Sequence, residues 1–395
     1  MKFLEPSANI KLVIAGTLSV AIALGVGRFA YTPILPFMQN DLILSSTDLG
    51  ALASWNFFGY LVGSMVPLLS KNIVYRQRVI FFIALGLSVL TTALMGSVDM
   101  FALLVCIRFI AGISSALTLI LGTGLIFKAL ELTGHSYLKL AHFCGFGIGI
   151  IISAVVVAIT NKLGFNWSSQ WMILAFLCCL LSIPVLFYIP KEKKPETTLK
   201  QVIVLKIHSN LPFIFISIGY GLFGAGYIIF GTFISAMSKN LPYLYSFGEQ
   251  AWLIVGIAAT PSVFLWQKLS NFIGRDLSLS LACMVSAFGV FLAIEFVSVI
   301  WIALGCIMYG AGMPGIVALT LLEGKNRYQG LITSAVAILT LSFSFGQMIG
   351  PLLAGFLIDM IGDYFFAMQV SVLLLFLAGI FMIHPCRVFN HLTDS

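Results

Sequence analysis

Residues 12–38 read LVIAGTLSVAIALGVGRFAYTPILPFM, an apolar run in which Arg28 is the only charged residue. A helix needs about 20 apolar residues to cross the hydrocarbon core of a bilayer, so this run is long enough to span one. Lys2 and Lys11 precede the run, as basic residues precede a cleavable signal peptide. Because the run is longer than the apolar core of a signal peptide and many such runs follow, we interpret it as an uncleaved first helix.

The composition extends this interpretation to the whole chain. Of its 395 residues, 60% are hydrophobic and 9% are charged, and the mean hydropathy is +1.07. A water-soluble globule of this length would need far more polar surface. The apolar runs are solid rather than alternating, which indicates helices and not a closed barrel. We therefore expect an all-α polytopic membrane protein whose surroundings are the lipid bilayer.

The runs of spanning length predict twelve transmembrane helices, at residues 12–38, 49–70, 79–98, 100–127, 140–160, 170–189, 211–237, 250–267, 277–297, 299–322, 331–358 and 364–384. The longest polar segment, IPKEKKPETTLKQ at residues 189–201, divides them into six and six. We predict an N-terminal six-helix bundle at residues 1–189, a cytoplasmic linker at 190–210 and a C-terminal six-helix bundle at 211–395.

The distribution of basic residues predicts the topology. The net charge of +7 comes from Lys and Arg scattered between the apolar runs, a pattern that does not favour nucleic acid as a partner. Of the 21 basic residues, 17 fall on one side of the predicted membrane, and only Lys162 and Lys239 fall on the other. Positive charge is retained on the cytoplasmic side, so we expect both termini in the cytoplasm.

The polar residues show no pattern typical of an enzyme or a metal site. The seven cysteines lie in or beside apolar runs and form no CxxC or Cys/His spacing, so we expect neither disulfides nor a structural metal. The sequence shows no Ser/His/Asp grouping and no phosphate-binding loop. We therefore expect no enzymatic activity and no cofactor.

An internal repeat relates the two halves at an offset of about 200 residues. GVGRFAY at residues 25–31 aligns with GAGYIIF at residues 224–230, so Tyr227 occupies the position that corresponds to Arg28. Duplicated halves are typical of secondary transporters, which bind their solute between the halves near the midplane of the bilayer. The positive charge of Arg28 therefore has no counterpart at the matching position of the second half.

Arg28 lies 16 residues beyond Leu12, or about 24 Å along a helix at 1.5 Å per residue. Placing arginine near the bilayer centre costs about 2.5 to 3.5 kcal/mol, so it should face a wet cavity or a partner. Tyr31 and Thr32 share its face at i+3 and i+4. The alternative is a side chain that snorkels to the outer interface.

Arg108 is the only charged residue in the fourth run, and Tyr309 occupies the corresponding position in the second half. Gly112 lies one turn away, and small residues let a neighbouring helix approach closely. Two interpretations remain open: Arg108 donates to backbone carbonyls of a neighbouring helix, or it contacts the solute directly.

All 14 acidic residues can be assigned to loops or to span ends, so no mid-span carboxylate neutralises Arg28 and Arg108. A solute that carries the counter-charge relieves the cost of a buried charge. The arginine fork favours a carboxylate, which suggests a small organic acid or a carboxylate-bearing chelator. The candidate solute-binding residues are Arg28, Tyr31, Asn56, Tyr60, Arg108, Tyr227, Tyr309 and Gln347.

Glycine clusters in the fifth and eleventh runs, at residues 142–153 and 346–355, indicate tight helix packing more than ligand contact. Pro351 should kink the eleventh helix. The candidate gating and packing residues are Gly112, Gly346, Gly350, Pro351 and Gly355.

Coupling to a proton would need a titratable group near the membrane. Without a buried carboxylate, the candidates are His142 near the inner end of the fifth run, Glu323 near the inner end of the tenth, and the solute itself.

Three motifs carry a family resemblance. LVCIRFIAG at residues 104–112 resembles the fourth-span arginine motif of the major facilitator superfamily, and GQMIGPLLAG at 346–355 resembles its antiporter motif. Together with GVGRFAYTPILP at 25–36, they are similar to a poorly characterised bacterial branch of that superfamily. The resemblance implies two pseudo-symmetric six-helix bundles in the bacterial inner membrane and transport by alternating access.

Departures from the superfamily pattern limit what the resemblance implies. The chain has no Asp or Glu from Leu49 to Val98, where a gating motif is expected, and NFIGR at residues 271–275 has Asn in place of Asp. The glycine-proline motif lies in the eleventh span rather than the fifth, so it does not imply drug/proton antiport. We expect a monomeric secondary transporter of an organic anion; drug or metabolite efflux by proton antiport and a non-transporting sensor are the alternatives.

Overall fold

The computed structural model describes residues 6–69, 76–135, 138–190, 211–240, 247–296, 298–327 and 332–393. Within these ranges the regular structure is helical, and 12 segments are long and apolar enough to cross a membrane. Each predicted run falls on one of them, so the predicted all-α fold of twelve spans is confirmed. Residues 191–210 of the predicted linker lie outside the described residues.

The first span of the first half is broken into three parts: α1 (Pro6–Val20), the π-helix η1 (Ala21–Val26) and α2 (Tyr31–Leu42). The helices that follow in this half are α3 (Ser46–Leu69), α5 (Gln77–Met95), α6 (Phe101–Leu132), the short η3 (Ala141–Cys144), α7 (Gly145–Lys162) and α8 (Trp167–Tyr188).

The second half contains six long helices. They are α9 (Leu211–Lys239), α10 (Gly248–Ile273), α11 (Arg275–Glu295), α12 (Val299–Arg327), α13 (Ile332–Ile361) and α14 (Tyr364–Thr393).

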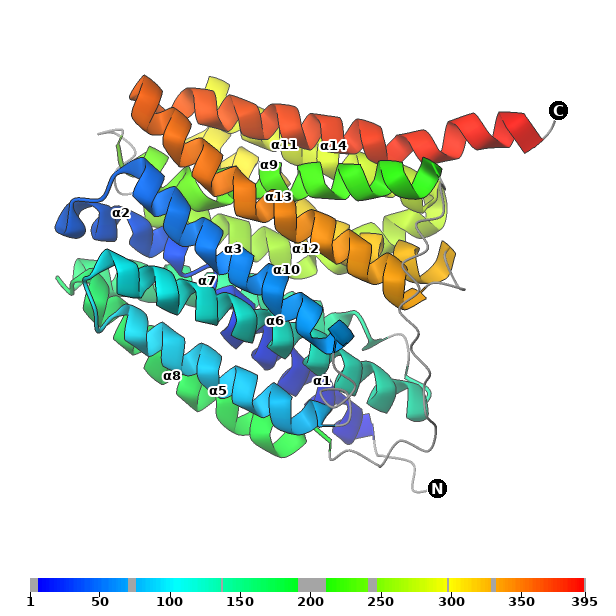
Figure 1. Ribbon diagram of the computed structural model, residues 1–395, viewed down its shortest axis with the longest axis horizontal. Helices are drawn as coiled ribbons and strands as arrows, with labels where there is room; N and C mark the ends of the chain where they lie inside the picture. Colours follow the sequence, from blue (N-terminus) through cyan, green and yellow to red (C-terminus); the bar gives the residue numbers. More distant parts are fainter. Residues whose placement is uncertain are drawn as a thin grey trace.

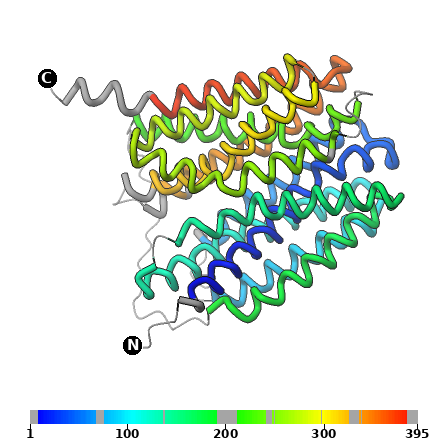
Figure 2. Tube along the Cα trace, turned by 180° about the vertical axis from the view of Figure 1, so that it is seen from behind, coloured from blue at the N-terminus to red at the C-terminus, as the bar shows by residue number. Residues whose placement is uncertain are grey.

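The long helices lie roughly parallel or antiparallel to one another along the longest axis of the molecule, and both chain ends lie at the same end of the bundle (Figure 1). We call this end the termini side and the opposite end the far side. The first half, blue to green, and the second half, green to red, lie against each other, as the view from behind also shows (Figure 2). The two halves meet where α3 packs on α13, α7 on α10 and α2 on α9.

Glycines let helix backbones touch within each half. A side chain on Gly25 of η1 would collide with the backbone of Gly149 in α7, and one on Gly112 would collide with the backbone of α3. In α13, Gly346 and Gly350 pack on the backbone of α9. The predicted glycine clusters therefore lie at close helix contacts, where a methyl group would push the helices apart.

Candidate functional site

The first span is irregular at its centre. Gly27 N–H donates to the carbonyl of Ile22 at 2.9 Å and Phe29 N–H to that of Leu24 at 3.1 Å, so each hydrogen bond reaches back five residues instead of four. Such π-type turns recur at functional sites in helices. The turn leads directly into Arg28 and places this side chain between the two halves.

Arg28 is buried, with 4% of its surface exposed. One Nη donates to Oε1 of Gln347 at 2.8 Å, and the guanidinium carbon lies 4.1 Å from the ring centroid of Phe57 and 4.5 Å from that of Tyr60. Its Nε is buried without a hydrogen-bond partner. The alternative interpretation, a side chain that snorkels to the outer interface, is not what the structure shows.

No carboxylate neutralises Arg28 among the residues that the structure describes. The ion pairs Lys139–Glu131 and Arg275–Glu323 both lie elsewhere. Aromatic faces attract a cation, but this attraction is worth only about 0.5 to 2 kcal/mol. The site therefore holds a desolvated positive charge with vacant donor capacity.

A relay of side chains continues from Arg28 into the second half. Gln347 of α13 accepts from Arg28, and its Nε2 donates to the hydroxyl of Tyr227 in α9 at 2.6 Å. The two positions that the sequence repeat pairs, Arg28 and Tyr227, thus meet in one network.

Beside this network lies a small cavity of about 30 Å³, room for about two water molecules. Among the described residues that line it, Arg28 is the only charged one. The aromatic lining residues are Tyr60, Phe146, Tyr220, Tyr227 and Phe343. The rest of the lining is apolar except for Thr340.

Hydrogen bonds tie the two halves together on the far side of Arg28. Thr32 Oγ1 donates to the carbonyl of Gly231 at 2.6 Å, and Trp252 Nε1 donates to that of Phe29 at 3.2 Å. Pro33 has no N–H with which to bond the Phe29 carbonyl within the helix. This carbonyl also accepts from Thr32 N–H at 3.3 Å, and its second lone pair is open to Trp252 of the other half.

A carboxylate closes the contact nearest the far side. Asp359, near the end of α13, accepts from the backbone N–H groups of Ser46 at 2.9 Å and Thr47 at 2.7 Å, in the first turn of α3. A helix N-terminus carries partial positive charge and free N–H groups, so it binds an anion well. Gly355 packs against the backbone of Ser46 at the same contact.

Arg108 faces backbone rather than the cavity. Its Nε donates to the carbonyl of Leu52 at 3.3 Å and Nη1 to that of Gly27 at 3.5 Å, and its guanidinium lies over the ring of Tyr31. Asn56 Nδ2 donates to the carbonyl of Arg108 at 2.9 Å. Of the two interpretations left open by the sequence, the structure shows the donation to carbonyls.

Two of the predicted tyrosines are engaged in the same way. Tyr31 donates to the carbonyl of Leu49 at 2.9 Å, and Tyr309 to that of Tyr227 at 2.6 Å. Together with Arg108 and Asn56, they stand behind the cavity and do not line it. They were expected to form its wall; in this structure Tyr31, Tyr309 and Arg108 donate to backbone carbonyls. The amide of Asn56 does the same, while its Oδ1 is buried without a hydrogen-bond partner.

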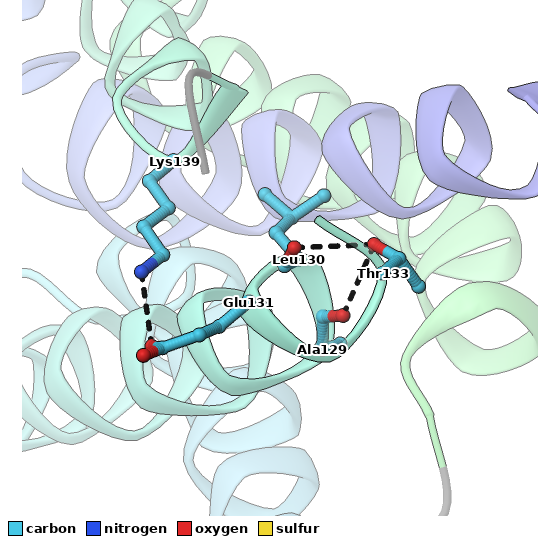
Figure 3. Close-up of polar contacts among 5 residues, drawn as sticks. All are labelled: Ala129, Leu130, Glu131, Thr133 and Lys139. Carbon is cyan, nitrogen blue, oxygen red and sulfur yellow. Dashed lines mark hydrogen bonds and ion pairs between the residues drawn. The ribbon is translucent and has the colours of Figure 1, made fainter. Parts of the chain in front are cut away.

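The coupling candidates also lie away from the cavity lining. His142 Nε2 is 3.0 Å from Thr123 Oγ1, and its Nδ1 is 2.7 Å from the carbonyl of Lys139. Lys139 forms an ion pair of 3.0 Å with Glu131 of α6, whose side chain is exposed; Figure 3 shows the two side chains pointing toward each other. Nearby, Thr133 donates to the last carbonyls of α6 (Figure 3).

Glu323 of α12 forms an ion pair with Arg275, the arginine of the NFIGR segment. Arg275 thus has a carboxylate partner on another helix of the same half, while Asn271 stands where the superfamily pattern has Asp. Within the described part of the chain, no group of three or more His, Cys, Asp or Glu side chains could hold a metal ion.

A comparison with known families identifies the family to which this chain belongs. The family model described as "Uncharacterised MFS-type transporter YbfB" matches residues 20–383. The chain belongs to this MFS transporter family. No curated protein matches it in sequence.

Solved structures share the fold of this MFS transporter. The nucleoside transporter NupG has a TM-score of 0.73 at 17% identity, covering 95% of this chain and 98% of that chain. A bacterial homologue of the human lysosomal transporter Spinster, inward-facing and occupied, has a TM-score of 0.67 at 14% identity, covering 99% and 98%. At these identities the likeness concerns the fold alone.

Several residues of the transporter's site were missed by sequence reasoning. Phe343 lies one turn before Gln347, and Tyr220 lies two turns before Tyr227, so helical spacing from the predicted residues could have found both. Trp252 and Asp359 carry no such signal, because each meets a helix that is far away in sequence.

Proposed function

We propose that this MFS transporter moves a small organic anion, an organic acid or a carboxylate-bearing chelator, by alternating access. The observation that carries the proposal is the buried guanidinium of Arg28, which has one hydrogen bond and no carboxylate partner among the described residues. Leaving a buried charge unpaired costs several kcal/mol, and an anionic solute removes that cost. A carboxylate suits the arginine fork because it can accept two parallel hydrogen bonds.

The proposed cycle requires the halves to move apart. A cavity of about 30 Å³ is too small for an organic solute, and the far-side hydrogen bonds hold the halves together. The predominance of basic residues in the loops of the termini side supports placing this side in the cytoplasm of a bacterium. In this orientation, the described conformation is closed toward the outside of the inner membrane.

Energy for transport would come from an ion gradient, with the proton as the first candidate, or from exchange of solutes, and we propose that the unit is the monomer. Drug or metabolite efflux by proton antiport is the first alternative. It is less favoured, because His142 and Glu323 both lie away from the cavity lining. A sensor with the same site would bind the anion without net flux.

A neutral nucleoside is a second candidate solute. The aromatic lining of the cavity favours a flat ring, and the NupG structure that shares this fold is that of a nucleoside transporter. A nucleoside would leave the charge of Arg28 uncompensated, so the anion remains the better proposal.

Thermal unfolding of the purified transporter tests the charge requirement. A ligand that binds only the native state stabilises it by about 2.7 kcal/mol at 100 times its Kd. Organic acids should raise the unfolding temperature, whereas the matching amides and adenosine should not. Arg28→Ala should lose the response, and the control Arg78→Ala, which removes an arginine outside the cavity, should keep it. Equal responses to acids and amides would overturn the proposal, and uptake of the best acid into proteoliposomes separates a transporter from a sensor.

A further inference from the structure

Three of the cavity's aromatic rings form one nearly parallel wall. The ring of Phe343 lies 4.5 Å from that of Tyr220, with 10° between their planes, and 5.8 Å from that of Tyr227, with 5° between them. Phe223 lies nearly parallel beside these rings, 5.2 Å from that of Tyr227 and 5.9 Å from that of Phe343. All four rings come from α9 and α13, so the wall belongs to the second half.

The cation stands on the opposite side, in the first half. Arg28 is held between the rings of Phe57 and Tyr60, and its bond to Gln347 points it toward the wall. The Thr340 hydroxyl already donates to the carbonyl of Val336 at 2.8 Å. Arg28 is thus the single charge of the described lining; the other lining residues carry hydroxyl groups only on Tyr60, Tyr220, Tyr227 and Thr340 and are otherwise aromatic or aliphatic.

We propose, resting on the proposed transport of an anion, that the solute is a planar aromatic monocarboxylate. Its carboxylate binds Arg28, and its ring packs on the wall of Tyr220, Phe343 and Tyr227. A flat ring can extend a parallel stack or meet ring edges, both of which are geometries that aromatic pairs prefer.

The same surface argues against other organic anions. A second carboxylate would find no second cation in the described lining, and an isolated buried carboxylate is very costly. The hydroxyl groups of a sugar acid would face mostly carbon and lose their hydrogen bonds to water. One negative charge and an apolar, flat body satisfy both limits.

Three probes of similar size separate charge from ring. Benzoate carries both, cyclohexanecarboxylate carries the charge without a flat ring, and benzamide carries the ring without the charge. Binding to the purified full-length transporter is measured by calorimetry. Benzoate should bind about 2- to 10-fold tighter than cyclohexanecarboxylate, the range that an aromatic pair contributes beyond its buried area. Benzamide should bind at least about 30-fold more weakly than benzoate, because it leaves the charge unpaired.

A matched pair of variants assigns the ring effect to the wall. Phe343→Leu keeps an apolar side chain but removes the ring, so benzoate and cyclohexanecarboxylate should bind equally while benzamide stays weak. Phe291→Leu, which alters an exposed ring of α11, should leave all three affinities unchanged. If Phe343→Leu does not fold, Tyr220→Leu takes its place, and the comparison of probes on the unmodified transporter needs no variant.

The outcomes distinguish this inference from the proposal beneath it. Equal affinity for benzoate and cyclohexanecarboxylate, with benzamide weak, would overturn the aromatic solute and leave the anion site standing. Equal affinity for benzoate and benzamide would overturn the anion site itself. Failure of both acids to bind would overturn both.

Discussion

The two halves of this transporter share a short sequence match at an offset of about 200 residues but bring unlike chemistry to the cavity between them. The first half supplies Arg28, and the second supplies Tyr227 at the matching position, together with Gln347 and the aromatic wall. The small residues of the repeat are shared, since Gly25 and Gly224 both allow a close helix contact. The two matching positions thus share a close helix contact, whereas the charge lies in one half.

The termini side shows a second difference between the halves. In the second half, α11 and α12 are joined by the ion pair of Arg275 and Glu323. In the first half, the corresponding helices α5 and α6 are joined by Gln77, whose Nε2 donates to the carbonyl of Leu121 at 2.8 Å. The charge in the cavity lies in the first half, and this ion pair lies in the second.

The largest expected effect comes from the two buried arginines of the first half. Arg28→Ala should abolish anion binding in a folded protein, a loss of about 30-fold or more, because the solute loses its buried partner. Arg28→Lys keeps the charge without the fork and should retain weak binding. Binding is measured by calorimetry and folding by size-exclusion chromatography.

Arg108 provides the contrast within the same half. Arg108→Ala should reduce the folded yield, because the carbonyls of Leu52 and Gly27 lose their donor. Normal anion binding in Arg28→Ala would contradict Arg28 as the anion-binding residue. A folded Arg108→Ala protein that fails only in binding would contradict the structural role of Arg108.

Gln347→Glu moves a negative charge into the second half. The new carboxylate would pair with Arg28, so the unfolding temperature without ligand should rise while the affinity for benzoate falls by about tenfold or more. Gln347→Leu, the matched control, removes the amide without adding charge and should not raise the unfolding temperature. A Gln347→Glu protein that binds benzoate normally would contradict an uncompensated Arg28.

Asp359→Asn tests the contact between the halves on the far side. The amide has a single oxygen, so it can accept from only one of the two N–H groups of Ser46 and Thr47. It also loses the charge that the α3 N-terminus favours, which is worth about 0.3 to 1 kcal/mol. The far-side-closed state should become less populated by at least about 2- to 5-fold, the effect of the lost charge alone. A cysteine introduced at Leu35, in a background without native cysteines, should then be labelled faster from the far side.

Asp363→Asn is the control for this change. Asp363 accepts from Phe365 N–H within its own half, so its amide should leave the labelling rate unchanged. Equal acceleration in both variants would mean that Asp359 does not hold the halves together.

The sequence predicted the spans, because hydrophobicity decides them. It also predicted that Arg28 would face a cavity or a partner, and it included Gln347 among the candidate solute-binding residues; the structure places these two side chains in contact. Phe343 and Tyr220 were not predicted. Helical spacing from Gln347 and Tyr227 places them on the matching helix faces, but the chain has 34 phenylalanines and most faces of a membrane helix accept them. Phe343 is 6% exposed and Phe345 is 55% exposed, a difference that only the packing of α13 decides.

Backbone features were equally hidden from the sequence. The π-turn before Arg28 depends on how η1 packs on α7, and glycines at 25 and 27 permit it without requiring it. The sequence also left the role of Arg108 open. Donation to backbone carbonyls and contact with the solute require the same residue type, and they differ only in the atoms that the guanidinium faces.

The smallest expected effect concerns proton coupling, where the halves offer one candidate each. His142 of the first half is held between Thr123 and the carbonyl of Lys139, and Glu323 of the second is paired with Arg275. Because neither lines the cavity, the pH dependence of benzoate transport should survive in His142→Gln and in Glu323→Gln, with rates within about twofold. The bound species would be the carboxylate, so affinity should fall as the pH drops through the pKa of the solute itself. Loss of pH dependence in one folded variant, with transport at the remaining rate, would instead identify that residue as the switch and assign coupling to its half.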